Sequence, residues 1–311
     1  MVYSSDLPNA LEPIRLKLLI IFNPNAAHGR SKKRLEDIRT RFKNLGIETS
    51  FKPTRHAGHG TKLVADATLS KFDGLVAAGG DGTVFEVLNG LYQHPKPARI
   101  PLGLLPLGTG NAFARELCFQ KDPLTDAIER LQRGHTRKVD VGFVKSADRS
   151  YYFVNIVSMG FAVDAGLVAL KMKALGQSAY TLATLWQVMK LKSYPLWLEI
   201  DGKPVKSDNI FVTFSNSQYT GTHFLIAPGA KIDDGKLDVT VLEKLPRSRL
   251  LKLFPSIYSG RHIDYKEIST YKASHIKIHS PQGYLLGPDG EFCGHSPAEI
   301  TCLPGDLTIF S

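Results

Sequence analysis

Leu75-Val76-Ala77-Ala78-Gly79-Gly80-Asp81-Gly82-Thr83 is the most informative stretch of this sequence. Its first four residues have the apolar pattern of a buried strand, and a helical segment, Val84 to Tyr92, follows the glycines. Glycines let the backbone turn sharply, and the amides of the next helix's first turn favour a phosphate. Asp81 would repel a bare phosphate, which indicates a metal-bound nucleotide. The stretch predicts a phosphoryl-transfer site; a plain turn with Asp81 as N-cap is the alternative.

The first third of the chain alternates strands with helices. Leu16 to Phe22 is a nearly continuous apolar run, and a turn-rich segment, Asn23 to Arg30, leads into a helix with apolar residues at helical spacing. Further strands are predicted at Ile47 to Thr54 and at Ile100 to Leu105, with a helix before each following strand. This order predicts an N-terminal doubly wound parallel α/β domain, which binds ligands at the carboxyl ends of its strands.

A second glycine loop, Pro106-Leu107-Gly108-Thr109-Gly110-Asn111, follows the strand that ends near Leu105. Because loops on neighbouring parallel strands share one edge of the sheet, the two glycine loops are expected to converge in space. Thr109 and Asn111 offer hydrogen bonds without charge, which suits a phosphate, a ribose or a hydroxyl group.

From Thr136 the pattern changes to short strands of alternating polarity separated by turns. We therefore predict two domains, residues 1–135 and residues 136–311, with packing of residues 300–311 back onto the first left open. One helical insertion, Asp164 to Lys192, is basic and amphipathic. A core-packing role is favoured for it over a membrane-surface role.

Two acidic turns lie in the second domain. Lys231 to Asp238 has three carboxylates around Gly235, which suits a hard cation, although an Asp-Gly hairpin explains the composition at least as well. Gly287-Pro288-Asp289-Gly290-Glu291 places two acids around a glycine, again on an expected hairpin. A phosphoryl-transfer enzyme needs a base for its acceptor hydroxyl, and the first domain offers few acids other than Asp81.

Composition bounds the remaining choices. The chain has 311 residues, 43% hydrophobic and 22% charged, as expected for a globular enzyme, and its formal charge of +10 suits an anionic partner. Cys118, Cys293 and Cys302 lack metal-ligand spacing, which favours a reducing compartment. No apolar run reaches the roughly 20 residues of a membrane span, and Met1 to Ala10 lacks signal-peptide features, so a cytoplasmic location is expected.

Together these motifs resemble the diacylglycerol kinase catalytic family, and more closely its bacterial YegS/DgkB/BmrU-like lipid kinases. The resemblance rests on five motifs in family order. They are Asn23-Pro24, Gly79 to Thr83, Pro106 to Asn111, Ile226-Ala227-Pro228 before Asp234-Gly235, and Asp289-Gly290-Glu291. It implies an α/β nucleotide domain followed by a β-sandwich lipid-substrate domain, with the active site in the cleft between them.

The resemblance also implies roles for single residues, with ATP and Mg²⁺ as cofactors. The implied nucleotide-binding residues are Asn23, Pro24, Asn25, Ala26, Ala27, Thr54, Gly79, Gly80, Asp81, Gly82, Thr83, Val84, Phe85, Thr109 and Asn111. Asp81 would serve the phosphates and Mg²⁺. A structural Mg²⁺ would be bound by the Asp234 side chain and by main-chain oxygens at Lys231 and Lys236. Asp289 and Glu291 would be catalytic acids. We assign Asp289 as the base and Glu291 as its partner, with the reverse as the close alternative.

One departure from the family pattern affects the acceptor. The family often has an acid where Ala112 stands in Asn111-Ala112-Phe113-Ala114. Diacylglycerol is the expected acceptor, with a sphingoid base or another lipid alcohol as alternatives. A nicotinamide-nucleotide kinase shares the first glycine loop but usually has an Asn-x-Gly-x-Leu-Gly-Phe-Leu run as its second, which is absent here. A non-catalytic nucleotide- or lipid-binding regulator is the alternative from another class.

The expected partners are a lipid substrate and an anionic membrane surface, contacted peripherally and transiently during turnover. No nucleic acid is expected as a partner, and a homodimer is left open.

Overall fold

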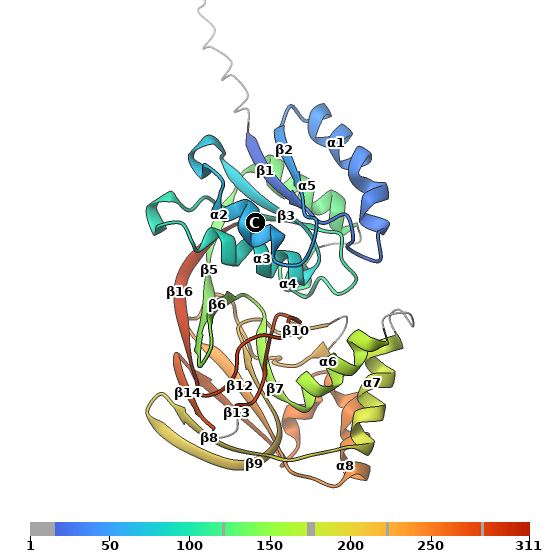
Figure 1. The fold of residues 1–311 in the computed structure, drawn as a ribbon, viewed down its shortest axis with the longest axis vertical. Helices are drawn as coiled ribbons and strands as arrows, with labels where there is room; N and C mark the ends of the chain where they lie inside the picture. The colour runs from blue at the N-terminus through green and yellow to red at the C-terminus, as the bar shows by residue number, and fades with distance from the viewer. Residues whose placement is uncertain (1–15, 120–121, 173–177, 222–223, 281–282) are drawn as a thin grey trace, which may run out of the picture.

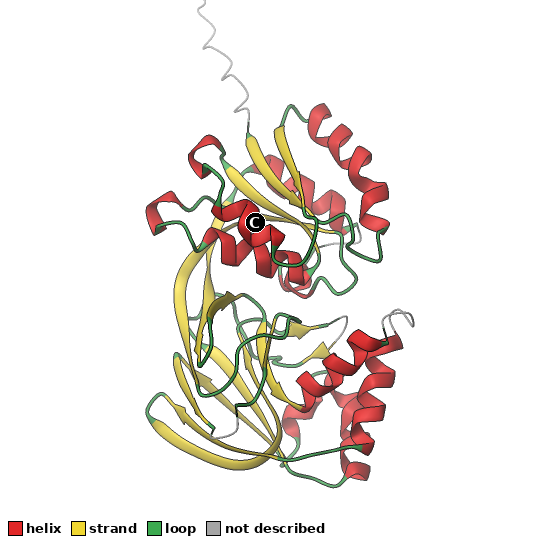
Figure 2. Cartoon of the chain, in the orientation of Figure 1, coloured by secondary structure: helices red, strands yellow, loops and turns green. Residues whose placement is uncertain are grey.

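The computed structural model describes residues 16–119, 122–172, 178–221, 224–280 and 283–311. The N-terminal stretch Met1 to Ala10, on which the expected location partly rests, lies outside these ranges. Figure 1 shows two stacked halves, and Figure 2 shows that the first is a sheet between helices while the second consists mainly of strands.

The first half is the doubly wound sheet that the sequence predicts. Strands β2, β1, β3 and β4 lie side by side in that order, and all the neighbouring pairs are parallel. The elements are β1 (Lys17–Phe22), α1 (Leu35–Asn44), β2 (Glu48–Pro53), α2 (His59–Ala65), β3 (Gly74–Gly79), α3 (Asp81–Leu91), β4 (Leu102–Pro106), α4 (Ala112–Glu116) and α5 (Pro123–Arg133), with 3-10 turns η1 (Arg30–Arg34), η2 (Leu69–Lys71) and η3 (Lys96–Ala98).

Alternation along β1 explains why helices cover both faces of this sheet. Leu18 and Ile20 pack into a core shared with α1 and α5, whereas Leu19 and Ile21 pack into a core shared with α2 and α3. Successive side chains of a strand point to opposite faces, so a continuous apolar run requires cover on both sides.

The second half is built from antiparallel strands with helices inserted between some of them. Its elements are β5 (Thr136–Ser146), β6 (Ser150–Phe153), β7 (Ile156–Gly160), α6 (Phe161–Lys171), α7 (Ser178–Met189), β8 (Tyr194–Ile200), β9 (Lys203–Ser215), β10 (Tyr219–Thr220), β11 (Phe224–Leu225), β12 (Leu237–Glu243), α8 (Arg247–Leu253), η5 (Phe254–Tyr258), η6 (Arg261–Asp264), β13 (Ile268–Ala273), β14 (His275–His279), β15 (Leu286–Pro288) and β16 (Ala298–Phe310). A hairpin with the turn Asp201-Gly202 joins β8 to β9, and both turn residues have positive φ.

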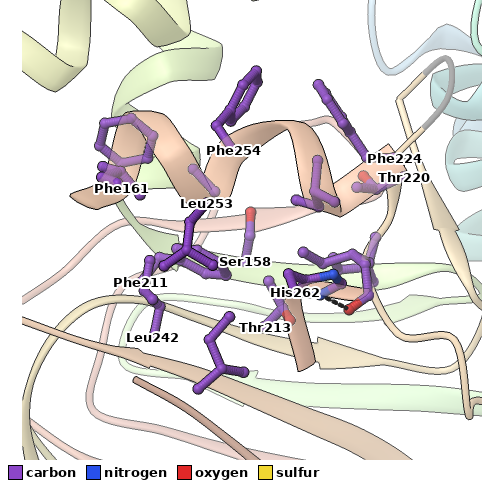
Figure 3. A pocket seen from close by; sticks show the side chains of 16 residues that line it. Ser158, Phe161, Phe211, Thr213, Thr220, Phe224, Leu242, Leu253, Phe254 and His262 are labelled. Carbon is purple, nitrogen blue, oxygen red and sulfur yellow. Dashed lines mark hydrogen bonds between the residues drawn. The ribbon is translucent and has the colours of Figure 1, made fainter. Parts of the chain in front are cut away.

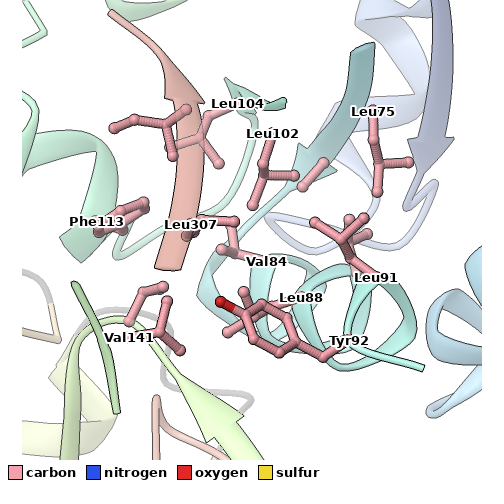
Figure 4. Close-up of a cluster of buried hydrophobic side chains, with 14 of the residues drawn as sticks. Leu75, Val84, Leu88, Leu91, Tyr92, Leu102, Leu104, Phe113, Val141 and Leu307 are labelled. Atoms are coloured by element: carbon pink, nitrogen blue, oxygen red, sulfur yellow. The ribbon is translucent and has the colours of Figure 1, made fainter. Parts of the chain in front are cut away.

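The last strand joins the two halves. Strand β16 pairs antiparallel with β5 along most of its length and reaches β4 through Ile309 and Leu102. Figure 4 shows the core at this junction, where Val84 and Leu88 of α3 lie near Val141 of β5 and Leu307 of β16. This shared core fixes the position of the first half's loops relative to the second half.

The helical insertion differs in part from the core-packing role favoured by the sequence. In α7, Ala183 and Val188 are buried, but the side chains of Leu182, Trp186 and Met189 are 43%, 57% and 66% exposed. The apolar face of this helix is therefore wider than its contact with the core. Within the described residues no helix is both long enough and apolar enough to cross a membrane.

Candidate active site

The glycine loops that follow β3 and β4 lie against each other, as predicted. The amides of Leu107 and Gly108 both donate to the Gly79 carbonyl, at 2.9 and 3.1 Å. The Asn111 side chain closes the second loop by accepting from the Gly108 amide and donating to the Gly108 carbonyl, both at 3.0 Å. A side chain at Gly108 would collide with the backbone of Gly80, so glycine is required there.

Asp81 is the first residue of α3, and its carboxylate faces the start of α4. Oδ1 accepts a hydrogen bond from the Phe113 amide at 3.3 Å, whereas the N-cap of α3 is Gly80 without any side-chain cap. The structure therefore does not show Asp81 as a plain N-cap. Burial raises the pKa of the Asp81 carboxyl, although the amides of Ala112 and Phe113 oppose that shift. A nearby cation would stabilise the ionised form of such a buried carboxylate.

A polar cleft of about 440 Å³ opens in front of the two loops. It is lined by Asn23, Asn25, Ala26, Ala27, Thr54, His56, Ala57, Gly80, Gly82, Thr83, Glu86, Gly108, Thr109 and Glu291. Asn23 connects the segment after β1 with the start of α3. Its Nδ2 donates to Thr83 Oγ1 at 3.1 Å, and its Oδ1 accepts from the Asn25 amide at 3.0 Å. The cleft thus gathers most of the predicted nucleotide residues, together with one acid of the second half.

The remaining predicted nucleotide residues do not line this cleft. They are Pro24, Gly79, Asp81, Val84, Phe85 and Asn111. Val84 is buried in the core, and the Phe85 ring lies 6.0 Å from the Tyr151 ring. Gly79 and Asn111 shape the two loops through the hydrogen bonds described above.

Sequence reasoning missed two polar residues of the cleft, His56 and Glu86. Glu86 holds the start of α2, because its two oxygens accept from the amides of Gly58 and Gly60, both at 2.7 Å. A signal for Glu86 was present, since it stands three residues after Thr83 in a predicted helix and so shares its face. His56 follows the predicted end of β2, where ligand-binding loops start.

The two acids of the Asp-Gly-Glu turn are placed differently. Asp289 is 5% exposed, and its carboxylate accepts three main-chain hydrogen bonds, from Val154 at 3.1 Å, Asn155 at 3.0 Å and Ile156 at 2.9 Å. Burial raises the pKa of Asp289 to about 7, while these amides act in the opposite direction. Asp289 therefore anchors the segment between β6 and β7.

Glu291, by contrast, reaches the cleft. Its Oε1 lies 2.5 Å from the place that a Cβ on Gly82 would occupy, at the amino end of α3. That end of a helix carries partial positive charge and favours a carboxylate. Asp289 and Gly290 both have positive φ, so the chain reverses between the two acids and they do not share one strand face. The geometry favours Glu291 over Asp289 as the acid that meets a ligand.

Replacing Asp289 by asparagine is expected to lower the free energy of unfolding by about 1–3 kcal/mol, because an amide cannot accept all three main-chain hydrogen bonds. The folded pKa of about 7 lies above the ordinary value of 3.8. Asp289 therefore stabilises the fold most at acid pH and loses this contribution as the pH rises to about 7. Denaturation curves should show a larger penalty for Asp289→Asn at pH 5 than at pH 8. A penalty that grows with pH would contradict the direction of this shift.

The predicted cation turn is occupied by a lysine. Asp234 Oδ2 accepts from Lys272 Nζ at 2.8 Å, and the same ammonium lies 3.2 Å from Asp238 Oδ2 and from the Gly229 carbonyl oxygen. Burial acts against the charge of Lys272, but the two carboxylates outweigh it and raise the pKa of this amine. The described residues contain no cluster of three or more acidic, histidine or cysteine side chains able to hold a metal. The oxygen chemistry fits Mg²⁺, but an ion would compete with this ammonium for Asp234.

Buried hydrogen bonds connect this turn to the Asp-Gly-Glu turn. Asp140 accepts from the Gly235 amide at 2.6 Å. Asn216 Nδ2 donates to the carbonyls of Asp140 at 3.0 Å and Val154 at 2.9 Å, and the Val154 amide donates to Asp289. A change at the cation turn can thus reach the acid turn through the protein interior.

An apolar pocket lies in the second half of the chain (Figure 3). Its cavity volume is about 110 Å³, smaller than that of the polar cleft. Its lining residues are Ile156, Ser158, Phe161, Ala162, Phe211, Thr213, Thr220, Phe224, Ile226, Leu242, Leu250, Leu253, Phe254, Ile257, His262 and Ile268. Strands β7, β9 and β12 form its floor, and α8 with the turns after it forms its roof.

The acid turn and the second glycine loop both lie close to this pocket. Ile156 lines the pocket and donates its amide to Asp289, and Ser158 Oγ donates to the Gly287 carbonyl at 3.2 Å. On the other side, Gly221 follows the lining residue Thr220, and its carbonyl oxygen lies 3.2 Å from the place of a Cβ on Gly110, in the second glycine loop. Residues in or next to the pocket therefore contact the acid turn and the second glycine loop, which carry Glu291 and Thr109 of the polar cleft.

Comparison with known proteins agrees with this arrangement. The family model described as "Diacylglycerol kinase catalytic domain" matches residues 17–144, and "YegS C-terminal NAD kinase beta sandwich-like domain" matches residues 155–311. The diacylglycerol kinase of Bacillus subtilis (strain 168) is 33% identical over 288 residues, which cover 91% of this chain and 92% of that protein. The chain belongs to the diacylglycerol kinase family. The diacylglycerol kinase of Mycobacterium tuberculosis (strain H37Rv) is 30% identical over 94% of each chain.

A solved structure supports the family fold. A candidate diacylglycerol kinase from Bacillus anthracis str. Sterne superposes with a TM-score of 0.79 at 28% identity, over 98% of this chain and 97% of that one. The α/β domain followed by a β-sandwich domain is thereby confirmed. Membership of the family supports a lipid kinase, and a kinase of this family uses ATP.

Proposed function

We propose that the protein transfers the γ-phosphate of ATP, in the presence of Mg²⁺, to the hydroxyl group of a diacylglycerol-like lipid. The placement of Glu291 carries the proposal, because this carboxylate lies in the polar cleft while its turn is bonded to the wall of the apolar pocket. A kinase that acts on a lipid needs such a junction between a phosphate site and an apolar acceptor site.

The polar cleft would bind the nucleotide. Asn23, Asn25, Ala26, Ala27, Thr54, Gly80, Gly82, Thr83 and Thr109 would contact it directly, and the other residues assigned from the sequence would support the loops. The amides at the start of α3 would donate to phosphate oxygens. Mg²⁺, when bound, would neutralise charge on the phosphates, and Asp81 is the residue that we propose to hold it.

Glu291 would act as the general base. Its carboxylate would accept the proton of the lipid hydroxyl as that oxygen forms its bond to the γ-phosphorus and the bond from phosphorus to the β-bridging oxygen breaks. ADP would be the leaving group. Asp289 would position the turn rather than accept the proton, because its two oxygens already accept three main-chain hydrogen bonds.

A competition assay tests the proposal. The purified chain with Mg-ATP is given 1,2-dioleoylglycerol in mixed micelles together with NAD, and both phosphorylated products are measured. We expect the lipid to be phosphorylated and NAD to remain unchanged. Phosphorylation of NAD with none on any lipid would support the nucleotide-kinase alternative, and ATP binding without turnover would support the regulator.

We also propose a structural Mg²⁺ at Asp234 and the main-chain oxygens of Lys231 and Lys236. Binding of this ion would break the hydrogen bond between Lys272 and Asp234. Saturating Mg²⁺ should stabilise the wild type by up to about 3 kcal/mol, the gain expected at roughly 100 times Kd. Asp234→Asn should abolish this gain and Lys272→Met should enlarge it, as measured by thermal denaturation with and without Mg²⁺. An equal Mg²⁺ effect in all three proteins would place the ion elsewhere.

Peripheral membrane contact is the last part of the proposal. The exposed side chains of Leu182, Trp186 and Met189 would enter the interface, with Lys190, whose Nζ lies 5.3 Å from the Trp186 ring centroid, near anionic headgroups. Each lysine or arginine near the surface adds about 1 kcal/mol and is screened over roughly 8 Å at physiological salt. The fraction of protein that sediments with anionic vesicles should therefore fall as the salt concentration rises.

Trp186→Ala should reduce this vesicle binding, whereas Trp197→Ala, a change to another exposed tryptophan on β8, should not. Equal binding to neutral and anionic vesicles, or an equal loss in both variants, would contradict α7 as the contact surface.

A further inference from the structure

Two buried polar atoms in the apolar pocket have no hydrogen-bond partner among the described residues. They are Nδ1 of His262 and Oγ1 of Thr213, in side chains that are 3% and 1% exposed. Both residues line the pocket, and Figure 3 shows them among its apolar side chains. Leaving such an atom unpaired costs about 1–3 kcal/mol, so native proteins seldom do so without a reason.

The hydrogen bond of the His262 ring determines which kind of partner Nδ1 needs. Nε2 lies 3.0 Å from the Ile226 carbonyl oxygen, so Nε2 carries the proton and donates. Burial lowers the pKa of the His262 imidazole, which keeps the ring neutral. In this tautomer Nδ1 is an acceptor only, and only an O–H or N–H group can satisfy it.

Thr213 stands in a row of hydroxyl side chains that crosses the sheet. Its neighbours in register are Ser158 on β7 and Thr240 on β12. Ser158 is paired in turn with Gly287, two residues before Asp289, and its hydroxyl donates to the Gly287 carbonyl. Two strand spacings, about 10 Å, therefore separate the backbone of Thr213 from that of Gly287. Thr213 Oγ1 thus lies inside the pocket on the sheet that carries the acid turn, whereas His262 Nδ1 belongs to the turn η6 on another wall of the same pocket.

We propose that the acceptor lipid carries a second hydroxyl or amide N–H, besides the hydroxyl that is phosphorylated, and that this group donates to His262 Nδ1 and meets Thr213 Oγ1. The inference rests on the proposed function, since it takes the apolar pocket as the acceptor site. The ester oxygens of a diacylglycerol accept hydrogen bonds but donate none, and its one hydroxyl is required at Glu291. A diacylglycerol would therefore leave His262 unpaired and would be a slower substrate than a lipid with a second donor.

Two matched lipid pairs test this inference on the full chain with Mg-ATP. The first pair is 1-oleoylglycerol and propane-1,3-diol mono-oleate, which differ only in a hydroxyl near the reacting end. The second pair is dioleoylglycerol and its analogue with 12-hydroxyoleoyl chains, which differ only in hydroxyls along the chains. In at least one pair the donor-bearing lipid should have the higher kcat/KM by about tenfold or more, because a site built for a hydrogen bond rejects the analogue that lacks it.

Variants assign the preference to the two residues. Thr213→Val and His262→Phe should each bring the ratio of kcat/KM within that pair close to one. Thr240→Val, which changes the neighbouring hydroxyl outside the pocket lining, should keep the wild-type ratio. Thr213→Val should also preserve or raise Tm, because it replaces a buried unpaired hydroxyl with a methyl group of similar shape.

The outcomes separate the inference from the proposed function. Equal kcat/KM within both pairs, or a preference that survives both variants, overturns the inference while lipid phosphorylation stands. If no lipid is phosphorylated, the proposed function fails. In that case the inference is tested by binding alone, as the retention of each lipid by the protein in native mass spectrometry. Equal retention within both pairs overturns it.

Discussion

Replacement of Glu291 by glutamine is expected to lower kcat by about 10²-fold or more, the scale of general-base catalysis. Glutamine keeps nearly the same size but cannot accept the proton of the acceptor hydroxyl at neutral pH. Because Glu291 lines the cleft while Asp289 holds the fold of its turn, Tm should stay close to that of the wild type. Steady-state kinetics with varied ATP should show KM for ATP little changed.

The control for Glu291→Gln is Glu86→Gln, which alters another carboxylate of the same cleft. Glu86 accepts hydrogen bonds from two amides at the start of α2, so its loss should change KM for ATP more than kcat. Activity near the wild-type level in Glu291→Gln would show that the base lies elsewhere. If Asp289→Asn kept its Tm but lost activity, while Glu291→Gln stayed active, the two roles would be reversed.

Replacement of Asp81 is expected to abolish activity without unfolding the protein. Asp81→Asn is the sharper variant, because an amide oxygen can still accept from the Phe113 amide while the charge that would hold Mg²⁺ is lost. Since burial raises the pKa of Asp81, the ionised carboxylate destabilises the protein when no cation is present. Without Mg²⁺, Asp81→Asn should therefore be at least as stable as the wild type.

Added Mg-ATP should change the thermal stability of the wild type and of Asp81→Asn by different amounts. It should raise the Tm of the wild type clearly and that of Asp81→Asn only slightly, as measured by thermal denaturation. Asn111→Ala, which removes the amide that closes the second loop, provides a comparison in which the charge is kept. A wild-type rate in Asp81→Asn would mean that the residue has only a structural role.

The architecture could be predicted because its signals are local. The apolar run at β1 requires cover on both faces, and Pro123 to Arg133 carries its own helix start and stop. The meeting of the two glycine loops also followed from topology alone, since adjacent parallel strands end at one edge. The positions of these loops therefore needed no knowledge of side-chain packing.

The details of the second half depend on contacts between distant residues. Asp289 binds the amides of Val154 to Ile156, more than 130 positions earlier in the chain, and no local pattern reports such a contact. No local pattern reports the contact between Lys272 and Asp234 either, because Lys272 belongs to another segment of the fold. The sequence favoured core packing over a membrane surface for the insertion that contains α7, because a wide apolar face has the same pattern whether a core or another surface covers it.

The central claim is that one site joins an ATP cleft to a lipid acceptor, and isotope transfer tests it most directly. The chain is supplied with ATP labelled with ¹⁸O in its γ-phosphate, together with Mg²⁺ and a mixture of lipid alcohols, and the products are analysed by mass spectrometry. We predict that the labelled phosphate is bound to a lipid hydroxyl, and that this product is strongly reduced with Glu291→Gln and Asp81→Asn. Label found only in inorganic phosphate or in a water-soluble acceptor, with none in any lipid, would contradict the account.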